Sequence, residues 1–237
     1  ANGRIFYKLD NTYGGLFEIG STNGIIKLSK PLTRSTRRQL DSFDIDVIIA
    51  DEGSPRRSIA TRIRAVIRDS NDHTPTFDFD HYEISVSEST LVNSRIVSII
   101  AVDLDEGDNG RIDYAITDGE MDKFGIFPDG QMFVQDALDR EETAYYSVTV
   151  TATDNGHPRR SSSTTIVIYV TDENDNKPFF GQKTYVMYLH ENEDPQTVVG
   201  RVSASDLDIG RNAELTYSFV SPIEYFELES RSGFITS

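Results

Sequence analysis

The stretch Ser147-Val148-Thr149-Val150-Thr151-Ala152-Thr153 alternates apolar residues with small polar residues along its whole length. Because successive side chains of a strand point to opposite faces, this period of two predicts a strand with one buried face. A similar alternation of Ile45, Val47 and Ile49 lies 103 residues upstream. Gly, Pro, Asn and Asp clusters separate such runs, as turns require, and no stretch keeps a helical apolar stripe over three turns. The sequence therefore predicts an all-β fold built from antiparallel β-sandwiches.

The same offset of 103 relates further parts of the chain. Asp69-Ser-Asn-Asp-His-Thr-Pro75 matches Asp172-Glu-Asn-Asp-Asn-Lys-Pro178, and Asp51-Glu-Gly-Ser-Pro55 matches Asp154-Asn-Gly-His-Pro158. Self-similarity at a fixed period indicates tandem structural units. We expect three repeats, of which the first lacks its opening strands, the second is complete and the third stops about half way through: 1–75, 76–178 and 179–237.

Composition excludes several classes of function. The chain has 39 acidic and 23 basic residues and a net charge of −16, so nucleic acid and anionic membranes would be repelled. It has no cysteine, and no apolar run approaches the roughly 18 residues of a membrane span. The four histidines lie in separate turns or beside strands, and no nucleophile elbow, phosphate loop or His-Glu-x-x-His motif occurs. We therefore expect neither an enzyme nor a protein with a small-molecule substrate.

Oxygen-bearing side chains are concentrated between the expected repeats. Residues 172–176 carry only such side chains, and Pro178 restricts the chain that follows. Calcium takes six to eight oxygen ligands, which fits this density, although an acidic turn between domains is an alternative for this motif alone. Further acids lie on segments that a sandwich would place at its ends, and two carboxylates 4 Å apart repel by roughly 4 kcal/mol at an effective dielectric of 20. An EF-hand does not fit, because position 6 of its loop, which requires Gly, would hold Asp108 or Lys177.

Four motifs together carry a resemblance to a known family. They are Leu-Asp-Arg-Glu at 138–141, Ala-x-Asp-x-Gly at 152–156, Asp-x-Asn-Asp-Asn-x-Pro at 172–178 and Asp-x-Asp-x-Gly-x-Asn at 206–212. In this order and at this period, the whole chain resembles the cadherin superfamily. The resemblance implies tandem seven-stranded Greek-key sandwiches with up to three calcium ions at each junction between repeats.

The resemblance also implies ligands at the second junction, residue by residue. The first ion takes the side chains of Glu88, Asp139, Glu141 and Asp175. The second ion takes Glu88, Glu141, Glu173, Asp175 and Asp208. The third ion takes Asn174, Asp206 and Asp208, together with the backbone carbonyls of Asn176 and Asn212.

The first junction departs from the family pattern. In place of Leu-Asp-Arg-Glu the first repeat has Leu32-Thr33-Arg34-Ser35, or Thr36-Arg37-Arg38 when it is aligned from the other side. Both alignments lose both carboxylates, and Ser70 stands where the second junction has Glu173. The remaining implied ligands are Asn71, Asp72, Asp103, Asp105 and Asp154, with the carbonyls of His73 and Asn109. We expect a calcium-poor junction that is bent or flexible; the alternative is that Asp41 or Asp44 moves in as a substitute ligand.

The resemblance implies a calcium-dependent adhesion or receptor ectodomain outside the cell, whose full-length form is anchored in the membrane. The implied partner is another cadherin, in a homophilic or a heterophilic contact. The chain has no tryptophan, which the strand-swapping members of the family use for adhesion, and no His-Ala-Val or Arg-Gly-Asp tripeptide. A non-adhesive spacer or tether, and a segment of a heterophilic signalling receptor, therefore stay open as alternatives.

Overall fold

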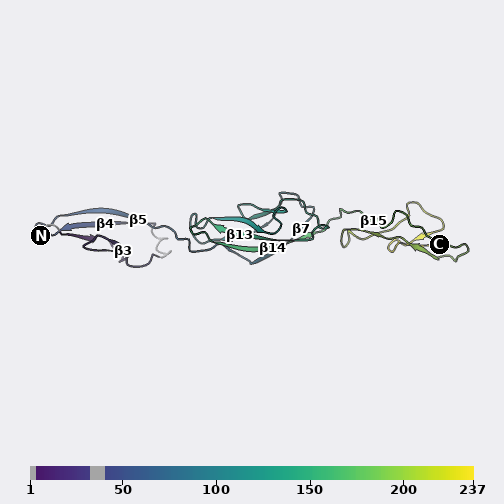
Figure 1. Ribbon diagram of the computed structural model, residues 1–237, viewed down its shortest axis with the longest axis horizontal. Coiled ribbons are helices and arrows are strands. Elements are labelled where there is room, and N and C mark those ends of the chain that lie inside the picture. Colours follow the sequence, from purple (N-terminus) through teal and green to yellow (C-terminus); the bar gives the residue numbers. More distant parts are fainter. Residues whose placement is uncertain (1–3, 33–40) are drawn as a thin grey trace. The chain divides into compact units, whose positions relative to one another are not determined.

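The computed structural model describes residues 4–32 and 41–237, and every regular element in these two ranges is a β-strand (Figure 1). The chain forms two compact units, Ala1–Ser70 and Asn71–Ser237. The prediction of an all-β protein is confirmed. The two boundaries between the expected repeats, after residues 75 and 178, stay predictions, since the division into compact units falls once, after Ser70.

The first unit contains two antiparallel sheets. One has the strand order β1-β4-β5 and the other pairs β2 with β3. Alternate residues of β4 face the core: Phe43, Ile45 and Val47 are buried, whereas the residues between them are half-buried. The strands are β1 (Ile5–Leu9), β2 (Phe17–Ile19), β3 (Ile26–Leu28), β4 (Ser42–Asp51) and β5 (Ser58–Val66).

The first part of the second unit is a sandwich of two main sheets. One sheet has the order β10-β13-β14-β7, the other has the order β11-β12-β8, and β6 pairs with β9. Within the larger sheet β14 runs parallel to β7, while its other pairs are antiparallel. The strands are β6 (Thr76–Phe77), β7 (His81–Ser87), β8 (Arg95–Ser98), β9 (Ala101–Val102), β10 (Ile112–Asp118), β11 (Phe124–Ile126), β12 (Gln131–Val134), β13 (Tyr145–Asp154) and β14 (Ser161–Thr171).

The core of this sandwich follows the alternation seen in the sequence. Val148, Val150 and Ala152 of β13 are at most 1% exposed, and the threonines between them are half-buried. Ile166 and Ile168 of β14 are fully buried and belong to the same core. Full burial of a Val or Ile side chain stabilises a fold by roughly 1.5–3 kcal/mol, so this pair of strands contributes much of the stability of the repeat.

The strand pairing confirms that the offset of 103 is structural. Ile45 lies opposite Ile63 in the β4–β5 pair, and Val148 lies opposite Ile166 in the β13–β14 pair. Each residue of the second pair lies 103 positions after its counterpart in the first. The two segments therefore form the same antiparallel hairpin in the same register.

The end of the chain forms two smaller sheets within the second unit. The pair β15-β17 is antiparallel, and a second sheet has the order β16-β19-β18. These strands follow the linker 172–178 directly. Their bounds are β15 (Phe179–Phe180), β16 (Val198–Arg201), β17 (Ala204–Ser205), β18 (Glu227–Leu228) and β19 (Phe234–Thr236).

Candidate metal centre

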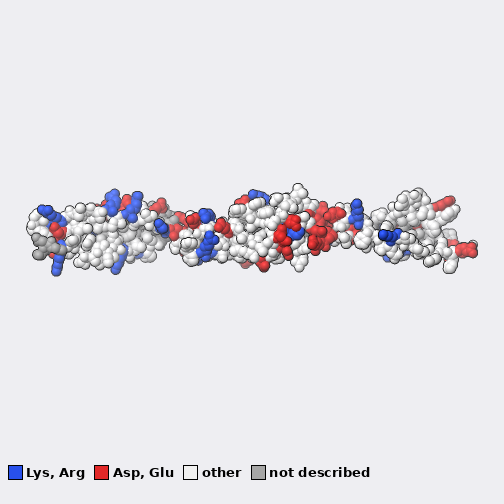
Figure 2. Space-filling view, turned by 45° about the horizontal axis from the view of Figure 1, so that its top comes forward, with Lys and Arg blue, Asp and Glu red and all other residues white. Residues whose placement is uncertain are grey.

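The candidate site lies where four segments of the second unit come together. Since β7 and β14 are parallel, their C-terminal ends lie at the same end of the sheet, and the Glu88 N–H donates to the carbonyl of Thr171 at 3.1 Å. The loop between β12 and β13 supplies residues 138–141, and the segment after β17 supplies residues 206–212. Figure 2 shows Asp and Glu side chains gathered close to where Figure 1 labels β7. The parallel pairing therefore brings residues far apart in sequence to one place.

Glu88 organises the centre of this site. Its side chain is buried, and its carboxylate accepts the backbone N–H of Arg140 at 2.8 Å and that of Glu173 at 2.6 Å. A buried carboxylate needs such donors, because burying it without partners would be strongly unfavourable. Glu88 therefore ties the 138–141 loop and the 172–176 linker to the end of β7.

Two groups of carboxylates meet at Glu141. The first is Glu88, Asp139 and Glu141; the second is Glu141, Asp172 and Asp208. Within each group the oxygen atoms lie within 4.8 Å of one another. Glu141 belongs to both groups, so its carboxylate links them.

The Arg140 guanidinium lies among these acids as a cation held by the chain itself. Its side chain is 11% exposed, and it donates to Asp172, to Glu141 and, at 2.8 Å, to the carbonyl of Leu207. Asp172 also accepts the Ile209 N–H at 3.1 Å. The guanidinium marks a position where the surrounding oxygens favour positive charge.

The pKa values of the carboxyl groups in this site are shifted by burial and by the negative charge of their neighbours. Burial, with the neighbouring Glu88 carboxylate, raises the pKa of both Glu141 and Asp175 above their ordinary values. Burial acts in the same direction on Asp172, but hydrogen bonds from Ile209 N–H, the Asn212 amide and Arg140 together lower the pKa of that carboxyl. Two acids of the site thus ionise less readily than they would in water, and positive charge nearby would counter this effect.

One buried oxygen of the site has no hydrogen-bond donor. Asp208 is 4% exposed; its Oδ1 accepts the Asn176 amide at 2.9 Å, and its Oδ2 has no partner. Leaving a buried carboxylate oxygen unpaired is costly, and a hard cation is the ligand that such an oxygen suits. The donor set, the raised pKa values and the orphaned oxygen all fit calcium.

The structure places most of the expected second-junction ligands together, with one exchange. Asp206 Oδ1 accepts the Asp208 N–H at 3.1 Å, and the Asn212 amide donates to Asp172 at 2.9 Å. Glu173 is different, because its Oε1 accepts the hydroxyl groups of Ser87 at 2.6 Å and Ser89 at 3.3 Å. Asp172, which is not among the ligands that the resemblance implied, lies among the converging acids in place of Glu173. The sequence shows Asp172 as the first acid of the same motif, but it does not show which of Asp172 and Glu173 faces the other acids.

A second oxygen-rich cluster lies at the other end of the sandwich. Asn71 is 7% exposed and Asp154 is fully buried, and the Asn71 amide donates to Asp154 Oδ2 at 3.1 Å. Gly156 permits this packing, because a Cβ there would lie 2.3 Å from Asn71 Nδ2 and 2.8 Å from Asn109 Oδ1. The structure therefore brings the side chains of Asn71, Asn109 and Asp154 together, whereas the resemblance implied a role for the backbone carbonyl of Asn109.

Two buried oxygens of this cluster are also without donors, Asn71 Oδ1 and Asp103 Oδ2. The other oxygen of Asp103 accepts the Asp105 N–H at 2.8 Å. The carboxylate of Asp154, in contrast, has a backbone donor, since its Oδ1 accepts the Gly156 N–H at 3.0 Å. The orphaned oxygens again fit a hard cation.

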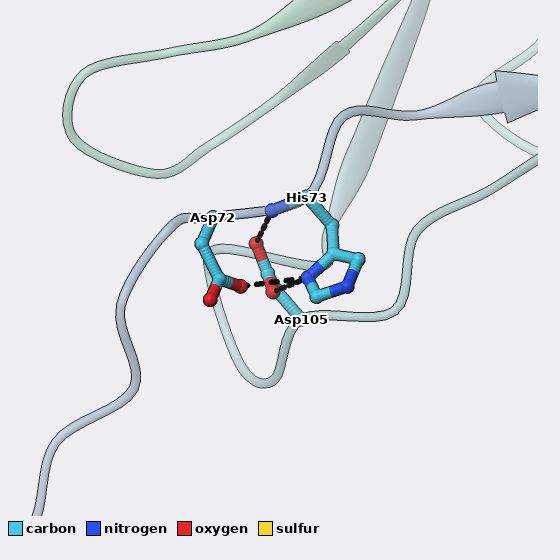
Figure 3. A group of neighbouring side chains, drawn as sticks. All are labelled: Asp72, His73 and Asp105. Atoms are coloured by element: carbon cyan, nitrogen blue, oxygen red, sulfur yellow. Dashed lines mark hydrogen bonds and ion pairs between the residues drawn. The ribbon is translucent and has the colours of Figure 1, made fainter. Parts of the chain in front are cut away.

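His73 brings an imidazole to the same region (Figure 3). Its Nδ1 lies 2.7 Å from Asp105 Oδ1 and 2.7 Å from Asp72 Oδ1, and its backbone N–H donates to Asp105 Oδ2 at 2.9 Å. Burial alone would raise the pKa of Asp105, but these contacts with His73 lower it. The resemblance implied a role for the backbone carbonyl of His73 only, and nothing in the sequence indicated where its ring lies.

The counterpart of Leu-Asp-Arg-Glu in the first unit, Thr33 to Arg38, lies outside the described residues. Asp41 and Asp44 are the two acids that could act as substitute calcium ligands. Asp44 lies in β4 and accepts a hydrogen bond from Arg64 Nε at 3.1 Å. Its carboxylate therefore belongs to an ion pair on the sheet.

Comparison with known proteins identifies the family of this chain. The family model described as Cadherin domain matches residues 82–171. The crystal structure of mouse Cadherin-23 EC22-24 is 34% identical, with a TM-score of 0.76, and the match covers 100% of this chain and 76% of that one. This chain belongs to the cadherin family. The predicted resemblance is confirmed, and so is the prediction that this cadherin chain is not an enzyme.

Curated relatives are much longer than this cadherin chain. Mouse Protocadherin Fat 4 is 38% identical over 237 residues, and Drosophila melanogaster Protein dachsous is 36% identical over 252 residues. Both matches cover 100% of this chain, which spans 5% of the first protein and 7% of the second. Among residues 4–32 and 41–237, no helix is long and apolar enough to cross a membrane.

Proposed function

We propose that this chain is a segment of an extracellular adhesion ectodomain whose junctions are braced by calcium. Its family supports a cell-adhesion or receptor role. The partner in this proposal is another cadherin. The relatives include a protein named as a seven-pass receptor, mouse Cadherin EGF LAG seven-pass G-type receptor 1, which supports anchorage of the full-length protein in a membrane. The observation that carries the proposal is that two clusters, each of three carboxylates, share the side chain of Glu141.

At the second junction the residues that would hold calcium come from both sides of the linker. Glu88, Asp139 and Glu141 belong to the sandwich, and Asp208 follows β17. Asp172 replaces the Glu173 side chain in this proposal, because Glu173 is hydrogen-bonded to serines. The remaining ligands are those of the expected set: Asn174, Asp175, Asn176, Asp206 and Asn212. Bound calcium supplies the positive charge that turns repulsion among these acids into attraction.

The stiffening follows from linkage. A ligand that binds one state better than another stabilises it by mass action, and these ligands come together only when the linker and the sandwich are aligned. Extracellular calcium modules bind with dissociation constants of roughly 0.1 to 1 mM, so the aligned state is favoured outside the cell. Without calcium, Arg140 supplies a positive side chain to the converging acids.

At the first junction we propose at most one calcium ion, held by Asn71, Asp103, Asp105 and Asp154 with the carbonyls of His73 and Asn109. The orphaned oxygens of Asn71 and Asp103 support this site. The sequence Leu32-Thr33-Arg34-Ser35 has no carboxylate to offer a further ion. A junction with fewer ions is less stiff, which would give the ectodomain a joint.

Calcium titration with paired variants tests these proposals. Asp175→Ala removes a carboxylate that the first and second ions share, so isothermal titration should lose about two of the three ions at the second junction. Asp72→Ala, its counterpart at offset 103, should leave the stoichiometry of the whole chain almost unchanged. Equal losses would contradict the asymmetry, and full binding by Asp175→Ala would contradict the site.

Adhesion itself needs a separate assay. Beads coated with the chain should aggregate in calcium and disperse in a chelator if the contact is homophilic. Aggregation that is absent with this chain alone and appears with a second cadherin would identify a heterophilic contact. Absence of both would favour a spacer, while leaving the calcium site to be judged by the titration.

A further inference from the structure

The outer face of the β11-β12-β8 sheet carries a pair of stacked aromatic rings. Met132 and Val134 of β12 are buried in the core, so Phe133 between them points to the opposite face of the sheet. The rings of Phe127 and Phe133 stack with their centroids 4.3 Å apart and their planes at 27°, and both residues are half-buried. The guanidinium carbon of Arg95 lies 4.9 Å from the centroid of the Phe127 ring. This face therefore presents two rings and a cation to solvent.

The equivalent positions of the other two repeats are polar. In the β11–β12 pair, Phe133 lies opposite Gly125, which directly follows the first residue of the motif Phe-Gly-Ile. The matching motifs are Phe-Glu-Ile and Phe-Glu-Leu, and their glutamates face polar partners: Glu18 lies opposite Lys27 in β2–β3, and Glu227 lies opposite Thr236 in β18–β19. A polar pair is the usual choice on the solvent side of an antiparallel sheet. The middle repeat alone of the three replaces it with glycine and phenylalanine.

Gly125 and Phe133 depend on each other. A Cβ on Gly125 would overlap the ring of Phe133, so the glycine lets this ring lie flat against the neighbouring strand. Glycine inside a strand weakens it, and a close approach such as this one is a common reason for its presence. Among the described residues, the core of this sandwich includes neither Phe127 nor Phe133. The arrangement thus produces a flat aromatic surface outside the core, and aromatic residues and Arg are enriched where proteins contact one another.

The charges at the rim of this surface indicate the kind of partner. Arg95 donates to Asp129 at 3.0 Å, and their side chains are 56% and 53% exposed, so one cation and one anion stand side by side. The whole chain has a net charge of −16, so two copies repel each other on average, and a surface with balanced charges is where this repulsion is weakest. In a contact with twofold symmetry, each residue meets its partner's counterpart reciprocally. Arg95 of each copy would then face Asp129 of the other, while the rings pack against each other.

We propose that Arg95, Gly125, Phe127, Asp129 and Phe133, together the aromatic patch, form a twofold contact between two copies of this chain. The converging acids of the described chain include none of these five residues, so the contact needs no bound calcium. It adds a surface and a partner to the adhesion role proposed above. Self-association through the aromatic patch can be measured whether or not the chain adheres, so the two proposals can fail separately.

Sedimentation equilibrium of the whole chain, in calcium and in a chelator, tests the contact. We expect a reversible dimer in both conditions. The double variant Gly125→Glu, Phe133→Lys introduces the polar pair of the first repeat, which the β2–β3 hairpin already accommodates. It should weaken the dimer at least about tenfold, because a twofold contact loses the aromatic side chain twice. Circular dichroism and the melting temperature of the double variant check that the sandwich is still folded.

A charge exchange tests the twofold geometry independently. Arg95→Asp and Asp129→Arg should each weaken self-association, because each places like charges opposite one another across the axis. A mixture of the two variants should restore the dimer, since each cross-axis pair then joins opposite charges. Loss of the ion pair within one copy gives no such rescue. Arg62→Asp is the matched control, because Arg62 is 64% exposed and also pairs with an aspartate, Asp46, but lies in the first unit.

Four results would overturn the proposal: a chain that stays monomeric up to about 1 mM, an undiminished dimer in the double variant, a dimer that is lost in chelator, or no rescue in the mixture. If the parent stays monomeric but binds a second cadherin that the double variant does not bind, the aromatic patch serves a heterophilic partner and the contact between copies is refuted. A dimer together with beads that do not aggregate would support the contact and count against homophilic adhesion.

Discussion

Neutralising Glu141 should have opposite effects with and without calcium. Its oxygen lies within 4.8 Å of the Glu88 carboxylate, and at that distance two charges repel by about 3.5 kcal/mol at a dielectric of 20 and about 0.9 kcal/mol at that of water. Its attraction to Arg140 offsets part of this repulsion. In a chelator, Glu141→Gln should therefore stabilise the fold by a net amount of about 1 kcal/mol, which corresponds to a rise of about 2–4 °C in Tm.

With calcium the sign should reverse. An ion with a dissociation constant of about 0.1–1 mM stabilises the folded state by about 0.6–1.8 kcal/mol at about 2 mM calcium. Because the proposed site gives Glu141 to two ions, the variant should forgo about 1–4 kcal/mol of calcium-induced stabilisation.

Calorimetric melting of both proteins in chelator and in calcium measures these shifts. Glu142→Gln is the matched control, since it removes the same charge from the next residue, which is exposed and belongs to neither carboxylate group. If Glu141→Gln kept the full calcium-induced rise in Tm, Glu141 would not be a shared ligand. If it melted lower than the parent in chelator, the repulsion argument would fail.

Three further outcomes are expected. Ile166→Ala removes a fully buried side chain and should lower the free energy of unfolding by about 2–5 kcal/mol in denaturant titration, whereas Ile59→Ala, at 72% exposure, should change it by less than about 0.5 kcal/mol. Asp154→Ala leaves two backbone N–H groups without their acceptor and should cost about 2–4 kcal/mol; an unchanged denaturation midpoint would contradict this. In chelator, Tm should rise as pH falls from 7 toward the pKa values of Glu141 and Asp175, because protonation of these acids relieves their repulsion. Both pKa values lie above the ordinary values of 4.5 and 3.8. With calcium, Tm should fall over the same pH range, and a change of the same sign in both conditions would refute the assignment.

The strands were predictable because one physical rule produces them. Alternation along Ser147–Thr153 sets which side chains are buried, and the offset of 103 transfers the same hairpin to the first unit. The acids of the site were predictable for a related reason: the motifs that carry them end strands or fill loops at one end of a sandwich.

The direction of individual side chains was not predictable. Asp172 and Glu173 follow β14 directly, and neighbouring side chains of an extended chain point to opposite sides, so only one can face the other acids. The sequence holds no sign of which one, because the choice depends on Ser87 and Ser89 being available to Glu173. The ring of His73 is a similar case, since its position depends on the distant Asp105.

The parallel pairing of β7 with β14 has a mechanical consequence. His81–Ser87 lies alongside Thr165–Thr171 in seven register pairs, and β7 is near the start of the sandwich whereas β14 is its last strand. A pull that draws the chain out at both ends drags these two strands past each other along their length. Their hydrogen bonds are then sheared together and share the force, whereas an antiparallel pair at the same place would be unzipped one bond at a time. The repeat is built so that tension along the chain loads all the hydrogen bonds of this pair at once.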